Sequence, residues 1–158
     1  MRSSFLIGKA AENRFLRCAR KRGYNVTKST IEEDRHMHVD YWISAMGYGK
    51  YGVDVKGSNS PNEIWCEFTN VNGETGWMYG ESKIIAFDMP EVGGFCLVDT
   101  KDLKSYCEMN VEDEFVSAKD AYKKKYTRNG RGDIITKINL SDLKKIISYR
   151  VWAYDTEY

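Results

Sequence analysis

The spacing of hydrophobic positions divides the chain into one long helix and a series of short strands. Over residues 3–22 apolar side chains return to one side at about 100° per residue, which predicts an amphipathic helix ending before Gly23. Apolar runs between polar and glycine-rich turns predict strands near residues 24–27, 36–44, 50–56, 64–71, 95–99, 134–140 and 150–154. Shorter helices are expected over 101–107 and from Ser141 or Asp142 to about residue 149. This order of elements predicts an α/β fold around a central mixed sheet flanked by helices.

The segments between these elements are predicted to be turns and loops. The acidic stretch 29–35 is expected to be a loop, and the glycines near 47–49 should join the strands at 36–44 and 50–56 as a hairpin. A glycine-rich turn follows at 72–80 and carries Trp77 and Tyr79. At 158 residues the chain fits one domain, with a core over about residues 3–100 and a C-terminal strand and helix extension over about 101–158.

Composition indicates the cellular compartment more clearly than it indicates the function. Four cysteines without a CxxC pair or zinc-ligand spacing indicate a reducing, intracellular compartment. No signal peptide and no apolar run long enough to cross a bilayer is present, so a cytoplasmic protein without membrane contact is expected. The net charge of +1 does not by itself indicate a nucleic-acid binder.

Two acids and a lysine on the neighbouring strands of the predicted hairpin suggest a catalytic site. Residues two apart on a strand share a face, so Asp54 and Lys56 point the same way while Val53 and Val55 point into the core. A hairpin would bring Asp40 beside Asp54. Two carboxylates with open water positions suit Mg²⁺, for which Mn²⁺ would substitute, and the Val55 carbonyl offers another oxygen. The pattern therefore predicts metal-assisted cleavage of a phosphodiester.

The lysine and a helix acid extend this predicted site. An ammonium beside two carboxylates stays charged, so Lys56 should hold the attacking water or stabilise charge on the phosphate. Glu12 falls within the apolar side of the first helix, where a carboxylate must be paired or bound to metal. A metal-linked Glu12 and a salt bridge from Glu12 to a core lysine or arginine are both open.

With a helix acid, a strand acid and Asp54-Val55-Lys56 in this order, the chain resembles the PD-(D/E)XK nuclease superfamily, which has the restriction-endonuclease-like fold. The resemblance covers about residues 3–100 and implies that Asp40 and Asp54 are metal ligands, Lys56 the catalytic lysine and Glu12 the helix acid. Val39 departs from the proline of the family name, and Asp54 from the commoner glutamate. The stretch 67–80 also resembles small phage-encoded nuclease-like proteins, which would place this chain in the host cytoplasm.

Three further residues are candidates for the site, and each also has an alternative explanation as a structural residue. By strand parity His38, like His36, shares the face of Asp40 and is a candidate second-layer residue; a hydrogen-bonded histidine at the strand entrance is the alternative. Glu67 is a candidate outer ligand or partner of Lys56, provided that its strand lies next to that of Lys56; a cross-strand ion pair is the alternative. Trp77 could stack on a base or cover the core.

Two clusters of basic residues are candidate DNA contacts, although a solvated face explains either cluster. The candidate contacts are Arg17 and Lys21 on the first helix, and Lys124, Arg128 and Arg131 in a later segment. The sequence as a whole predicts a Mg²⁺-dependent DNA endonuclease acting on duplex or branched DNA, with a homodimer compatible with two-strand cleavage. A nucleic-acid binding protein that keeps the fold without cleavage is the alternative, as is a protein acting on another protein.

Overall fold

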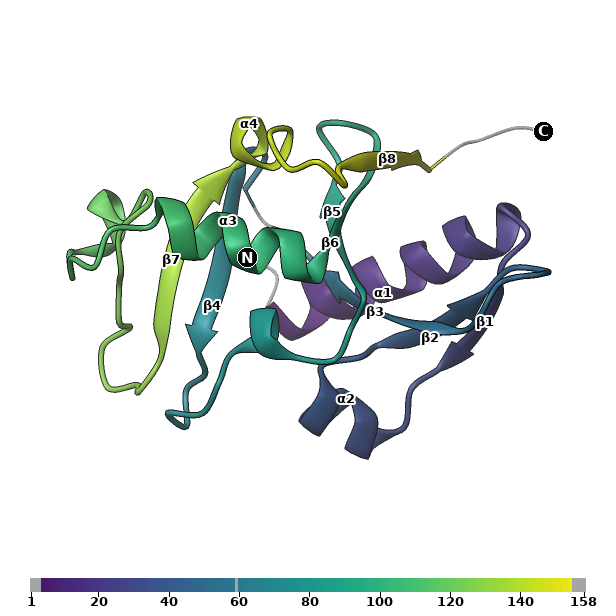
Figure 1. Cartoon of the computed structure of the whole chain (residues 1–158), viewed down its shortest axis with the longest axis horizontal. Helices are drawn as coiled ribbons and strands as arrows, with labels where there is room; N and C mark the ends of the chain where they lie inside the picture. The colour runs from purple at the N-terminus through teal and green to yellow at the C-terminus, as the bar shows by residue number, and fades with distance from the viewer. Residues whose placement is uncertain (1–3, 59, 155–158) are drawn as a thin grey trace.

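The computed structural model describes residues 4–58 and 60–154, and its centre is a six-stranded mixed sheet (Figure 1). Only β3 and β5 run parallel, while all other neighbouring strands are antiparallel. The predicted α/β class with a mixed sheet is therefore confirmed. In spatial order the strands are β1 (Asn25–Lys28), β2 (Tyr41–Ser44), β3 (Tyr51–Lys56), β5 (Ile84–Met89), β6 (Gly94–Asp99) and β8 (Arg150–Ala153).

A second, two-stranded sheet lies beside the first and pairs β4 (Glu63–Thr69) with β7 (Ile134–Asn139) in antiparallel fashion. The strand order is therefore not sequential, and the neighbour of β3 is β5 rather than the strand that carries Glu67. A parallel pair needs a long crossover, because the chain must return to the same end of the sheet. Here β4 and the short 3₁₀ helix η1 (Trp77–Tyr79) lie within that crossover.

Helix α1 (Ser4–Lys21) covers one face of the large sheet, and the prediction of this helix is confirmed. Its buried residues are Ala11, Phe15, Cys18 and Ala19, spaced as one helical stripe. Gly23 follows in the left-handed region at φ +86°, as expected for a residue that ends a helix. The predicted apolar face was wrong at its start, because Phe5 is 74% exposed and lines a pocket instead of the core.

The opposite face of the large sheet packs against the second sheet and α3 (Thr100–Asn110). Ile85 and Phe87 of β5 contribute to this core together with Trp77, Leu103 and Ile138. The helix predicted to run to residue 149 is shorter: α4 spans Leu140–Leu143, and the backbone continues in turns with i→i−3 hydrogen bonds. One further 3₁₀ helix, η2, spans Ala118–Asp120.

The acidic segment is a helix, α2 (Ile31–Met37), so the prediction of a loop at 29–35 was wrong, and β2 begins at Tyr41 rather than near residue 36. Thr30 and Glu33 form a capping box: the Thr30 hydroxyl accepts from the Glu33 N–H at 3.1 Å, and the Glu33 carboxylate accepts from the Thr30 N–H at 2.8 Å. His38 ends the helix in the left-handed region, at φ 56°.

None of the helices within residues 4–58 and 60–154 combines the length and the apolar character that a bilayer crossing requires.

Candidate active site

Two buried aspartates lie opposite each other where β2 and β3 meet. The register pairs Tyr41 with Val53, so Asp40, one residue before Tyr41, stands across from Asp54. The Asp40 N–H donates to the Val53 carbonyl at 2.8 Å, which holds this pairing beyond the end of β2. Asp40 is 8% exposed and Asp54 is 3% exposed. The structure thus brings together the two carboxyl groups that the hairpin pattern placed side by side.

Asp40 takes the place of a missing strand partner for β3. Its Oδ2 accepts a hydrogen bond from the Val55 N–H at 2.7 Å. The N–H and C=O of one residue point to the same side of a strand, so the Val55 carbonyl also lies on the Asp40 side. Burial, and then repulsion by the charge of Asp54, raise the pKa of Asp40 to about 8. Without a bound cation, burial and the second acid therefore favour the protonated form of Asp40.

One oxygen of Asp54 is paired and the other is not. Its Oδ1 lies 3.2 Å from the Lys56 ammonium, whereas Oδ2 is buried and receives no hydrogen bond from a donor in the part of the chain that the structure describes. Burial raises the pKa of Asp54, although the Lys56 charge and a contact with the Asp40 carboxyl offset part of the effect. A buried carboxylate oxygen without a partner is costly. Either a proton shared with Asp40 or a cation would satisfy it.

Lys56 is held between this acid pair and an aromatic ring. Its ammonium lies 4.8 Å from the ring centroid of Trp77, and the side chain keeps 30% of its surface exposed. Burial alone would lower the pKa of Lys56, but the charges of Asp54 and Asp40 outweigh it and raise the pKa. Lys56 is therefore a cation over the whole neutral range.

Trp77 belongs to the core beneath Lys56. It is 7% exposed and also packs edge-on against Phe87. The ring thus has little free face on which a base could stack, and the structure corresponds to the core alternative for this residue.

Glu67 and His38 reach the site by routes that differ from the predicted ones. Glu67 comes from the second sheet, and its carboxylate accepts from the backbone N–H of Trp77. Burial raises the pKa of Glu67, while the charge of Lys56 and that hydrogen bond oppose the rise. The parity argument for the histidines was wrong, because His36 lies in α2 and His38 in the left-handed turn after it. That turn brings His38 close enough for its charge to act on Asp54 and Glu67.

Glu12 is paired with a lysine that the sequence reasoning did not single out. The Lys28 ammonium lies 2.8 Å from the Glu12 carboxylate and donates to the Asp40 carbonyl at 3.3 Å. In the sequence Lys28 directly follows the edge strand predicted over 24–27, whereas in the structure it ends β1 and pairs with Tyr41. The contact corresponds to the salt-bridge alternative for Glu12. Its charge still acts on Asp40, since it contributes to the raised pKa of that residue.

The donor set suits a hard divalent cation with open positions. Among the described residues no group of three or more His, Cys, Asp or Glu side chains is arranged to hold a metal ion. Mg²⁺ is commonly bound by one or two carboxylates and keeps several water ligands. Asp40 and Asp54, with the orphaned Asp54 oxygen and the Val55 carbonyl, fit this requirement.

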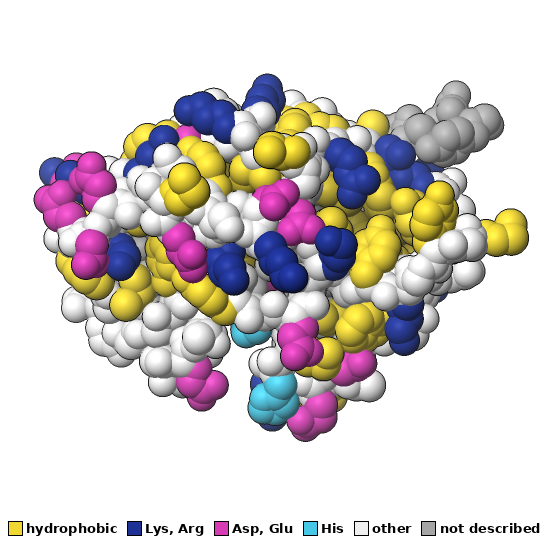
Figure 2. Space-filling view, viewed as in Figure 1, with side chains coloured by type: hydrophobic (Ala, Val, Ile, Leu, Met, Phe, Trp, Pro, Cys, Tyr) yellow, Lys and Arg dark blue, Asp and Glu magenta, His cyan; other side chains and the backbone are white. Residues whose placement is uncertain are grey.

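The two basic clusters differ in how far they are neutralised. Arg17 and Lys21 are exposed on α1. In the second cluster Lys124 lies 2.9 Å from Glu114, and Arg128 lies 2.5 Å from the buried Asp133. Arg131 of that cluster is exposed. The predicted second basic surface is therefore largely ion-paired, and Figure 2 shows acidic and basic side chains interleaved on the viewed face.

The surface is hollowed between the strand that carries Glu67 and the helix that precedes His38. Figure 2 shows a notch between the side of the molecule formed by β4 and β7 and the side formed by α2, with a histidine at its inner end. Glu67 belongs to β4, and His38 follows α2. The notch thus gives solvent a path toward the elements that carry these residues.

No protein-family model matches the chain, and no curated protein matches it. Among solved structures the fold is similar to that of a bacterial homing endonuclease, I-Ssp6803I, with a TM-score of 0.49 and 19% sequence identity. The matched region covers 67% of this chain and 72% of that chain. A similarity of this size identifies neither a family nor an activity for the present chain.

Proposed function

We propose that this chain is a divalent-metal-dependent nuclease of the PD-(D/E)XK type that hydrolyses phosphodiester bonds in DNA. The observation that carries the proposal is the buried pair Asp40 and Asp54, in which one Asp54 oxygen needs either a proton shared with Asp40 or a bound cation, with Lys56 ion-paired beside it. Two buried acids side by side still cost stability, because one lysine balances only one of their charges, and perturbed acids of this kind are typical of functional sites. Holding a cation beside a phosphate is such a function.

The acids have the role of holding the cation. Asp40 and Asp54 would bind Mg²⁺, or Mn²⁺ in its place, together with the Val55 carbonyl and water. A bound ion of this kind would polarise a phosphate oxygen and lower the pKa of a coordinated water. Asp40 must lose its proton to serve as a ligand, because burial and Asp54 raise its pKa to about 8.

Lys56 supplies the positive charge that the reaction needs on the protein side. Water loses a proton as its oxygen bonds to phosphorus, the bond from phosphorus to one ester oxygen breaks, and the leaving oxygen takes up a proton. Negative charge grows on the non-bridging oxygens on the way. The Lys56 ammonium is held by Asp54 at 3.2 Å and by the Trp77 ring, so it can stabilise that charge without reorganising.

Residues around the site would support the metal and contact the DNA. Glu12 would act from α1 on the metal environment through Lys28 and Asp40. Glu67 and His38 would adjust the charge around Lys56 and Asp54. Exposed Arg17 and Lys21 are proposed contacts for the DNA backbone, and a homodimer would serve cleavage of both strands of a duplex.

Cleavage assays test this function directly. Supercoiled, linear and branched DNA are incubated with Mg²⁺ or Mn²⁺ and with wild type, Asp54→Asn or Lys56→Met. Wild type should cleave, and each variant should lose about a hundredfold or more in rate. Lys83→Met is the matched control, because it breaks a similar lysine–aspartate pair, Lys83–Asp99 at 2.7 Å, on the exposed surface. Cleavage that survives in both site variants would sink the assignment.

The alternative function is separated by the same samples. A nucleic-acid binding protein without cleavage activity would retain DNA binding in a gel-shift assay while wild type leaves every substrate intact with either metal. That result would replace the nuclease proposal.

A further inference from the structure

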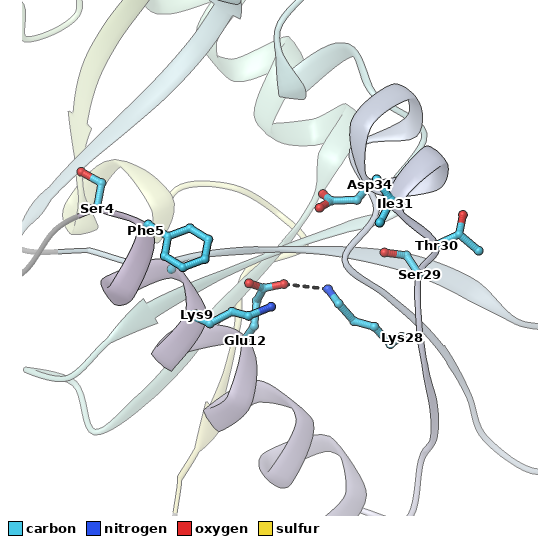
Figure 3. A pocket seen from close by; sticks show the side chains of 10 residues that line it. Ser4, Phe5, Lys9, Glu12, Lys28, Ser29, Thr30, Ile31 and Asp34 are labelled. Atoms are coloured by element: carbon cyan, nitrogen blue, oxygen red, sulfur yellow. Dashed lines mark hydrogen bonds and ion pairs between the residues drawn. The ribbon is translucent and has the colours of Figure 1, made fainter.

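Apart from the notch in the surface, a pocket opens between α1 and the segment that joins β1 to α2 (Figure 3). Its volume is about 370 Å³, which falls within the range of small-ligand sites, about 300–1,000 Å³. Phe5, Lys9 and Glu12 line it from α1, while Ser29 and Asp34 face them from the other side.

Two smaller pockets lie between this pocket and Lys56 in a chain of shared lining residues. Ser4 and Gly8 line this pocket and also a smaller neighbouring one that includes Gly57. Gly57 in turn lines the pocket at Lys56. Shared lining residues thus connect the three hollows past the first turns of α1.

A buried hydroxyl without a partner points to a ligand in this pocket. Ser29 is 8% exposed, and its Oγ has no hydrogen-bond partner in the described residues. Figure 3 shows this hydroxyl directed into the space between the carboxylates of Asp34 and Glu12. Buried hydroxyls are nearly always hydrogen-bonded, so this one indicates a polar group that binds there.

The other groups at the pocket match the parts of a nucleotide. Phe5 and Ile31 are 74% and 75% exposed, which leaves apolar surface free to cover a base. Asp34 offers acceptor oxygens to the amino group of a base edge, as acidic side chains do for cytosine. The ammonium group of Lys9 offers a cation for a phosphate.

We propose that this pocket binds one nucleotide of the substrate strand, next to the scissile phosphate. The base lies against Phe5, its edge contacts Ser29 and Asp34, and its phosphate contacts Lys9. The pocket is linked to the backbone of Asp40, because the Ser29 N–H and the Lys28 ammonium, both at the pocket, donate to the Asp40 carbonyl at 3.0 Å and 3.3 Å. The inference rests on the proposed nuclease function, and it adds a subsite and a preference for bases that carry an amino group.

Gly8 allows the subsite to be blocked without touching its polar groups. A Cβ built at Gly8 meets no atom within 4 Å, and the residue lines both the pocket and its smaller neighbour. Gly8→Leu places a side chain in that space, and leucine favours the helix more than glycine does. Asn13→Leu is the control, because it adds the same side chain to an exposed position of α1 outside the pocket.

Two readouts test the subsite on the full chain. For DNA cleavage with Mg²⁺, Gly8→Leu should raise KM about tenfold or more and leave kcat within about twofold. In amide NMR spectra, deoxycytidine 5′-monophosphate should shift the Phe5 and Ser29 signals of wild type, and these shifts should disappear in Gly8→Leu. Asn13→Leu should behave as wild type in both measurements.

The outcomes separate the subsite from the nuclease function. If wild type cleaves DNA and Gly8→Leu has the same KM as Asn13→Leu, the subsite is refuted and the nuclease stands. Equal shifts from inorganic phosphate alone would refute recognition of a base. If wild type cleaves no substrate, the nuclease proposal and the substrate subsite fall together.

Discussion

Replacing Asp40 with asparagine should make the metal-free protein more stable at neutral pH. Asp40 is 8% exposed and stands opposite Asp54, and burial followed by repulsion from that residue raises its pKa from 3.8 to about 8. A carboxyl whose pKa is raised on folding favours the native state while it is protonated. That contribution is present at low pH and is lost progressively as the pH rises from about 4 toward about 8.

The size of the expected gain in stability follows from the pKa shift of Asp40. At about 1.36 kcal/mol per pKa unit, the interval from 3.8 to pH 7 corresponds to an upper limit of about 4 kcal/mol. Asparagine removes the charge but keeps an oxygen that can accept from the Val55 N–H. It also removes the attraction between Asp40 and Lys56, so we expect a net gain of about 1–3 kcal/mol near pH 8 and almost none near pH 4.

Urea unfolding in EDTA, followed by the fluorescence of the four tryptophans, measures this gain. Asp88→Asn is the matched control, because Asp88 is also buried, at 2% exposed, but lies 2.6 Å from Arg14. That variant should lose stability at the same pH, since it leaves Arg14 without its partner. A metal-free Asp40→Asn protein no more stable than wild type near pH 8 would refute the account of the acid pair.

Three further substitutions test other parts of the structure. Lys56→Met should lower the cleavage rate about a hundredfold or more. Because the pKa of Lys56 is raised, wild-type activity should show no loss from Lys56 deprotonation up to about pH 9.5. A steady fall in the wild-type rate above pH 8 would contradict the role of Lys56 as a permanent cation. Glu12→Gln should raise the Mg²⁺ concentration for half-maximal cleavage about tenfold, and an unchanged titration would restrict Glu12 to its ion pair with Lys28. Asp142→Ala should lower the free energy of unfolding by about 3 kcal/mol, because the buried carboxylate accepts from the Tyr106 and Tyr122 hydroxyls. Hydrogen bonds hold the pKa of Asp142 below 3.8 despite burial, so this loss should shrink below about pH 4, as urea unfolding across that range would show.

Local periodicity determined the central part of the candidate site. Strand parity placed Asp54 and Lys56 on one face, and the hairpin placed Asp40 beside them, because both rules depend only on neighbouring residues. The helix over residues 4–21 was predictable for the same reason. The capping box of α2 was also present in the sequence as Thr30 and Glu33, although the acidic composition favoured a loop.

Tertiary structure decided everything that depends on which distant segments meet. Strand order moved Glu67 to a second sheet, and folding gave Glu12 its partner Lys28, sixteen residues away. It also neutralised much of the second basic cluster, as in the pair of Lys124 with Glu114. Local pattern states which way a side chain points, whereas long-range packing and the burial of charge select its partner. The sequence alone therefore determined the acids and the lysine, and only the fold decided how their charges are balanced.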